Sequence, residues 1–165
     1  FENPPREDWL DLPVVLLSWF DAQAYAEYYD MRLPTLAEQF WFGSRCLEEW
    51  LQLPEDQRLL RINLATVGTL GNATTFPHYL DGVLPSRKPE NRIGPDGIYH
   101  PIGNVMEWSS DSSTLGEFPD SRYTFGLHAA DPASGYQSMN TGPIPGQLAS
   151  PLLGFRCARS LDFDQ

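Results

Sequence analysis

The pattern of apolar and polar positions divides the chain into a regular first part and an irregular remainder. The apolar, β-branched run at 13–17, "PVVLL", predicts a short buried strand. Ser18 and Asp21 follow it as a variant capping box and predict that a helix begins there. The near-helical spacing of its apolar positions predicts the buried face of this helix, formed by Phe20, Ala24, Tyr25 and Tyr28.

A second helix is predicted directly after the "DMRLP" break. Thr35 and Glu38 form a further capping box, and "LPEDQ" ends the helix at about position 51. Its apolar positions favour burial of one face, with Leu36, Phe40, Leu47, Trp50 and Leu51.

The remainder is rich in Gly, Pro, Asn, Ser and Thr, and its apolar runs are brief. Short strands are predicted at 105–108, 123–127 and 155–158. The length of 165 residues suits one domain over 1–165, in which residues 1–12 form an extended lead-in. Two helices followed by short strands and long loops predict an α+β domain whose loops carry the function.

The excess of acidic over basic residues argues against two classes of binding partner, nucleic acids and membranes. The chain has 22 acidic and 11 basic residues, which gives a formal net charge of −11. A surface this acidic repels phosphate backbones and anionic lipid headgroups, so we expect neither nucleic-acid nor membrane binding. No apolar run has the length of a membrane-spanning helix. The sequence assigns no compartment.

Three ordered stretches resemble the formylglycine-generating enzyme, or sulfatase-modifying factor, family. They are the helical region ending in "RLPTLAEQFWF", the turn and strand "GNVMEW", and the closing "GFRCAR", and the resemblance covers 12–159. It implies a C-type-lectin-like fold with two helices, a small twisted antiparallel sheet and extensive irregular loops. Family members usually carry sheet strands before "PVV", where this chain has a dozen residues. Either it is a fragment, which we expect to be part of a longer, bacterial-type protein, or it is a reduced version of the domain.

The resemblance also implies which chemistry to look for. The copper-dependent oxidase of the family uses two cysteines shortly before the final "GFRC", but the corresponding region here, 124–151, contains no cysteine. Copper(I) needs soft thiolate ligands, so no copper is expected. Related sulfoxide synthases bind iron through an N-terminal bundle. The three histidines of this chain lie in separate loops without ligand spacing: His78, His100 and His128.

The carboxylate in "GNVMEW" has two interpretations. In the family this turn often binds calcium, and the resemblance assigns the ligand positions to His100, Gly103, Val105 and Glu107. An imidazole is a poor ligand for a cation that prefers oxygen. Alternatively, Glu107 is a structural carboxylate whose partner is Arg32, Arg156 or protonated His100, because an unpaired buried carboxylate is costly. Strand alternation places Val105 and Glu107 on one face and core Trp108 on the other.

Two further sites are predicted. The resemblance implies that Cys157 and Cys46 lie close together, and that they form a disulfide if the compartment is oxidising. The loop at 126–151 is the candidate ligand surface, since loops on this fold commonly carry recognition. Its candidate ligand-binding residues are His128, Asp131, Tyr136, Gln137 and Met139. Alternatively, this loop is an ordered, Pro-rich surface segment that binds no ligand.

Two functions remain open. The first is a non-catalytic binding or scaffolding domain that recognises a protein or other ligand, or an attached signalling domain, through its C-terminal loops. The second is a divergent metal-dependent oxidase or sulfoxide synthase whose ligands lie in a missing segment. The absence of the cysteine pair favours the first, although a fold alone does not decide a function.

Overall fold

The computed structural model describes residues 10–54, 57, 83–87, 92–93, 97–115, 118–128 and 142–161. Among these residues, two helices, α1 (Trp19–Tyr28) and α2 (Leu36–Gln52), precede six short strands. The strands follow in chain order: β1 (Arg92–Ile93), β2 (Ile98–Tyr99), β3 (Met106–Ser112), β4 (Ser121–Phe125), β5 (Pro143–Pro145) and β6 (Leu153–Gly154). None of the helices among these residues is long and apolar enough to cross a membrane.

The main sheet has the strand order β5-β4-β3-β6, and β1 pairs with β2 separately. β3 is antiparallel to β4 but parallel to β6, so the sheet is mixed rather than purely antiparallel as predicted. The predicted strand at 105–108 corresponds to β3, which begins one residue later and ends four residues later, and the predicted strand at 123–127 corresponds to β4, which lies two residues earlier. In place of the third, β6 ends at Gly154, and the chain beyond it contributes a single bridge between Ala158 and Arg32.

Both helices begin where the sequence predicts, because each start is fixed by local chemistry. The Ser18 hydroxyl accepts from the Asp21 amide, and the Asp21 carboxylate accepts from the Ser18 amide. Thr35 and Glu38 repeat this reciprocal pattern at α2. Each pair satisfies amides that have no partner inside the helix.

The predicted buried face of α1 is wrong. The residues that face the core are Ala22 and Ala26, which are fully buried against Trp108 and Leu153. The predicted inward residues are exposed instead: Phe20, Ala24, Tyr25 and Tyr28. The large Trp108 side chain already fills the space under the helix, so small side chains on α1 allow a close approach.

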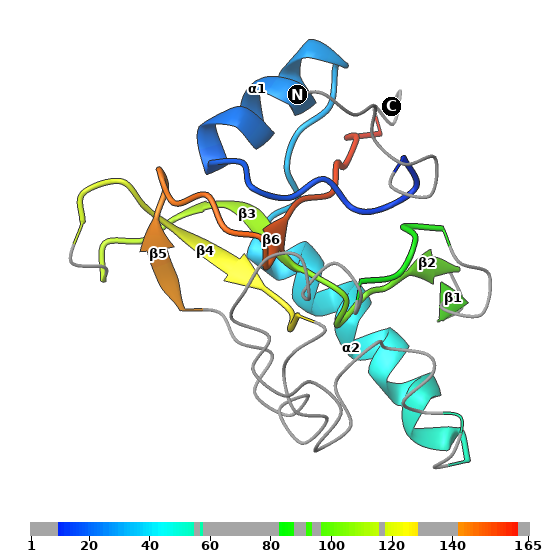
Figure 1. Cartoon of the computed structure of the whole chain (residues 1–165). Coiled ribbons are helices and arrows are strands. Elements are labelled where there is room, and N and C mark those ends of the chain that lie inside the picture. The colour runs from blue at the N-terminus through cyan, green and yellow to red at the C-terminus, as the bar shows by residue number, and fades with distance from the viewer. Residues whose placement is uncertain are drawn as a thin grey trace, which may run out of the picture.

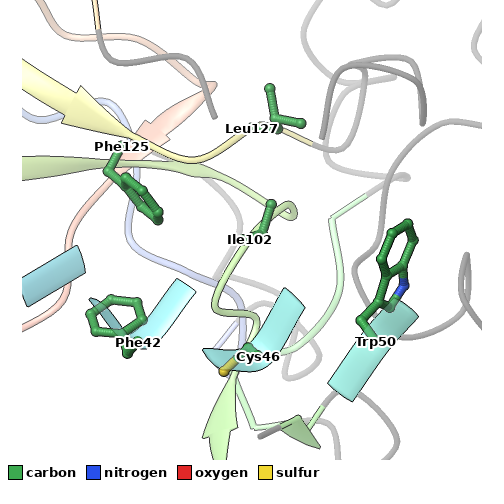
Figure 2. Close-up of a cluster of buried hydrophobic side chains, with 6 residues drawn as sticks. All are labelled: Phe42, Cys46, Trp50, Ile102, Phe125 and Leu127. Atoms are coloured by element: carbon green, nitrogen blue, oxygen red, sulfur yellow. The ribbon is translucent and has the colours of Figure 1, made fainter. Parts of the chain in front are cut away.

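α2 covers the other face of the sheet and buries Gln39, Phe42, Gly43, Cys46 and Trp50. Phe42, Cys46 and Trp50 of this helix form one cluster with Ile102, Phe125 and Leu127, and Figure 2 shows the three helix residues on the side of the helix that faces the strands. Of the predicted inward positions, Trp50 is buried and Leu36 and Leu47 are half-buried, whereas Phe40 and Leu51 are exposed. The result is three layers, α1, sheet and α2, as Figure 1 shows.

The predicted strand at 13–17 does not form. Val14 and Leu16 are exposed, and Leu16 adopts the left-handed conformation with φ 61°, which interrupts an extended run. The segment instead crosses over the edge strand β6. A Cβ at Gly154 would lie 2.7 Å from the Val14 carbonyl oxygen, so this crossing requires a glycine there.

Candidate functional site

The turn between β2 and β3 is built from left-handed backbone. His100, Gly103 and Asn104 have φ values of 43°, 84° and 68°. Asn104 tolerates this conformation because its short amide can bond locally. Its side chain accepts from the Leu84 amide at 2.8 Å and donates to the Leu84 carbonyl at 3.1 Å. The Asn104 amide therefore fastens the 83–87 segment to the turn.

Glu107, the second residue of β3, is paired with Arg156. The guanidinium donates from Nε to Oε2 and from Nη2 to Oε1, the latter at 2.6 Å. The same Nη2 donates to the His100 carbonyl at 2.9 Å. The side chains are 22% (Arg156) and 11% (Glu107) exposed. Of the three partners predicted for Glu107, the structure selects Arg156, which thereby joins β3, the turn and the C-terminal segment.

Electrostatics keeps the Arg156 guanidinium ionised. Burial acts to lower the pKa of Arg156, but the charge of Glu107 and its hydrogen bonds outweigh that effect and raise the pKa above its ordinary value. The guanidinium also lies over the Phe42 ring, 5.0 Å from its centroid, so an aromatic face covers its apolar side. Arg32, another of the predicted partners of Glu107, pairs with Glu38 instead.

A cavity of about 550 Å³ opens beside the pair. Part of its wall comes from the 12–14 crossing, Tyr25 of α1, the 86–87 segment, and the C-terminal residues 155–157. The turn from Tyr99 to Val105 and the Glu107–Arg156 pair also line it. Aromatic walls around a few polar groups are typical of a binding site.

Three side chains in this cavity that could act as an acid, a base or a nucleophile, Glu107, His100 and Cys157, are either hydrogen-bonded or held in their less reactive form. Both Glu107 oxygens accept from Arg156. The His100 Nε2 lies 3.0 Å from the Pro85 carbonyl oxygen, which can only accept, so this nitrogen carries a proton and donates. Burial raises the pKa of the Cys157 thiol, so the thiolate, which is the nucleophilic form, is disfavoured.

Two of the predicted calcium ligands, His100 and Glu107, already have protein partners in this arrangement. The His100 ring is turned to Pro85, and its carbonyl and the Glu107 carboxylate both accept from Arg156. Within the described parts of the chain, no three His, Cys, Asp or Glu side chains are grouped to hold a metal. A positive charge already occupies the carboxylate. We therefore propose that Arg156, rather than calcium, holds Glu107.

The remaining predicted site residues are placed as follows. His128 follows β4 and is half-buried, whereas Asp131, Tyr136, Gln137 and Met139 lie outside the described residues. Cys46 and Cys157 are free thiols in the structure, and they pack in different hydrophobic clusters. The disulfide stays a prediction for an oxidising compartment.

Two features of the site region were not found from the sequence. Asp111 of β3 accepts from the Leu36 amide at 2.6 Å and so caps α2 from 75 residues away. Tyr25 lines the cavity although it was assigned to the core. Neither residue gave a local signal, because the role of each depends on a contact with another element.

Comparison with known proteins identifies the family. The family model for FGE-sulfatase, the sulfatase-modifying factor enzyme 1-like domain, matches residues 2–161. The chain belongs to this family. It is 33% identical over 162 residues to "Inactive C-alpha-formylglycine-generating enzyme 2" of Mus musculus, which covers 92% of this chain and 50% of the relative. The Bos taurus protein of the same name is 31% identical over 159 residues, covering 90% and 50%. The chain thus spans about half the length of these curated relatives.

Solved structures support the FGE-sulfatase fold. CarF superposes with a TM-score of 0.66 at 21% identity, covering 97% of this chain and 72% of CarF. PvdO from Pseudomonas aeruginosa superposes with a TM-score of 0.67 at 19% identity, covering 98% and 65%. At these identities the likeness concerns the fold. The predicted family and α+β architecture are confirmed.

Proposed function

We propose that this chain is a non-catalytic binding domain of the FGE-sulfatase family. The observation that carries the proposal is the state of the cavity: its carboxylate is bound to Arg156, its imidazole donates to Pro85, and its thiol has a raised pKa. An acid, base or nucleophile needs a free, suitably ionised group, and these side chains lack that freedom. The cavity keeps the concave, aromatic-lined shape of a binding site.

Two further facts support the proposal. The chain has two cysteines. Cys46 lies on α2 and is buried, while Cys157 packs in a different hydrophobic cluster. A copper site built from a pair of accessible thiolates therefore has no matching residues. The curated mouse and cattle relatives carry names that describe them as inactive. The proposed contact regions are the cavity and the loop at 126–151, with the predicted residues His128, Asp131, Tyr136, Gln137 and Met139.

The catalytic alternative is tested directly. The chain is incubated with oxygen, a cysteine-containing peptide and either copper(I) or iron(II), and aldehyde formation and oxygen consumption are measured. We expect no turnover above the metal-only control. Turnover that requires the folded chain would overturn the proposal and favour the divergent metal-dependent oxidase.

Binding is tested in parallel with the immobilised chain. Proteins or glycans retained from an extract are identified by mass spectrometry, with excess free chain as competitor. The matched variant replaces residues 129–141 by a Gly/Ser linker of the same length. The proposal expects a ligand that free chain displaces and that the linker variant loses. Retention of nothing that free chain displaces would contradict a binding role.

A further inference from the structure

The first helix directs aromatic side chains to solvent. Tyr25, Tyr28 and Tyr29 are 50%, 82% and 49% exposed, while the alanines of α1 pack on the sheet. Figure 1 shows α1 as the outermost layer above the sheet. A protein rarely exposes several large aromatic rings side by side without a use for them. We call Tyr25, Glu27, Tyr28, Tyr29 and Asp30 the tyrosine face.

The rings of this face form a connected series. The centroids of Tyr28 and Tyr29 lie 5.0 Å apart, those of Tyr25 and Tyr29 4.9 Å, and those of Tyr25 and Phe155 5.3 Å. Tyr25 and Phe155 also line the cavity, so the series runs from solvent to the cavity wall. Rings that already contact one another lose little freedom when a partner binds.

Both charged residues of the tyrosine face are acidic, and the basic Arg159 lies at its edge. Glu27 and Asp30 are exposed beside the rings, and the last turn of α1 contains no basic residue to offset the partial negative charge of the helix C-terminus. The Arg159 Nη2 lies 3.4 Å from the Tyr29 carbonyl oxygen, so one guanidinium of the chain itself already bonds to this helix end. Aromatic faces attract cations in addition.

We propose that the tyrosine face docks a basic, arginine-bearing segment of a partner protein. The guanidinium groups lie over the rings of Tyr28 and Tyr29 and pair with Glu27 and Asp30. The net charge of −11 steers such a segment toward the chain and repels acidic ones. A purely apolar partner fits less well, because it would bury both carboxylates without a counter-charge.

The experiment uses the 165-residue chain and three fluorescent peptides that carry arginine, lysine or glutamate at the same positions. Fluorescence anisotropy measures binding at low and at physiological ionic strength. We expect the arginine peptide to bind best and to weaken with salt. Tyr28→Ala lowers its affinity roughly fivefold, whereas Tyr28→Phe, which keeps the ring, retains most of it.

A pair of matched variants separates the tyrosine face from the overall charge. Glu27→Gln with Asp30→Asn removes two charges from the face, and asparagine tolerates the left-handed backbone of Asp30. Glu48→Gln with Glu49→Gln removes two exposed charges from α2. Equal weakening by both pairs, unchanged binding by Tyr28→Ala, or equal binding of the glutamate peptide would overturn the proposal. Circular dichroism confirms that each variant is folded.

This inference rests on the proposed binding function, but the two fail separately. If the arginine peptide does not bind as expected, but the immobilised chain still retains a ligand, only the proposed role of the tyrosine face is rejected. Turnover in the oxidation assay rejects the binding function, whatever the peptides do.

Discussion

The contact between Glu107 and Arg156 shows how one residue pair can join segments that lie far apart in the sequence. One guanidinium joins the carboxylate of β3 to the carbonyl of His100, across 49 and 56 residues of sequence. The turn therefore depends on a cation supplied by the C-terminal segment. Because the pair is mostly buried, losing one partner costs more than the pair itself contributes.

We predict that Arg156→Met destabilises the chain by roughly 3 kcal/mol, since it leaves the Glu107 carboxylate largely buried without its guanidinium. Urea unfolding measures the change. Arg159→Met is the control, because it makes the same substitution at an exposed position of the same segment. Adding Glu107→Gln to Arg156→Met should recover part of the loss. The idea fails if both arginine variants unfold at the same urea concentration.

The same contact predicts how the chain responds to calcium. Both Glu107 oxygens accept from Arg156, so added calcium gains no free carboxylate at this turn. The melting temperature should not change with a chelator or with excess calcium, compared with magnesium at equal concentration. A melting temperature that rises steadily with calcium concentration, as binding to the native state requires, would show that the metal displaces the arginine.

At the scale of elements, the start of α2 carries an ion pair that depends on pH. Arg32 donates to Glu38 at 2.6 and 2.7 Å, and this hydrogen bonding lowers the pKa of Glu38 from 4.5 to about 2. A depressed native pKa gives stability that is present above 4.5 and lost as the pH falls toward about 2. Since the side chains are 35% and 43% exposed, solvent screening limits the gain to about 1 kcal/mol or less.

Glu38→Gln tests this pair, because glutamine preserves the capping box while removing the charge. We predict that the variant loses less stability than the unmodified chain when the pH is lowered from about 5 to about 2. Denaturant unfolding across that range provides the measurement. Glu48→Gln, on the exposed side of the same helix, is the control and should follow the unmodified chain. Identical pH dependence for both variants would show that the pair contributes nothing.

α1 illustrates packing by small side chains. Ala22 and Ala26 are fully buried against Trp108 and Leu153, so a larger residue has no space there. We predict that Ala26→Leu costs roughly 1–3 kcal/mol through overpacking, whereas Ala24→Leu, on the exposed side, changes stability little. Thermal unfolding of the two variants compares one substitution on two sides of one helix. A stable Ala26→Leu chain would indicate that the helix can move away from the sheet.

Elements could be predicted where the interactions that form them lie close together in the sequence, and not where those interactions join distant segments. The helix starts at Ser18 and Thr35 were predictable because each capping box lies within four residues. The buried face of α1 was not, because it depends on Trp108, which lies in another element. Likewise, the register of "GNVMEW" indicated a structural carboxylate, but only the folded chain selects Arg156 among its candidate partners. The cavity walls come from five segments that are distant in the sequence, so no local pattern could predict the cavity.

At the scale of the molecule, the sheet separates two environments. On the α1 side, Trp108 and Leu153 form a cluster with alanines, and on the α2 side Phe42 and Phe125 form another. Glu107 pairs in register with Phe125, so its carboxylate points to the α2 side, beneath the guanidinium that covers Phe42. The cavity lies where the crossing segment, α1 and the C-terminal residues meet. Binding there, and on the neighbouring tyrosine face, leaves both cores undisturbed.

The net charge of −11 gives a final prediction for the whole chain. Excess like charge destabilises a compact state through self-repulsion, and salt screens this repulsion over a distance of ~8 Å at physiological ionic strength. The melting temperature should therefore rise from low to physiological salt, and sodium and choline chloride should act equally because screening does not depend on the cation. The Glu107–Arg156 pair is mostly buried and is screened little, so its contribution does not oppose the trend. A melting temperature that falls with salt would mean that exposed ion pairs, rather than self-repulsion, dominate the surface electrostatics.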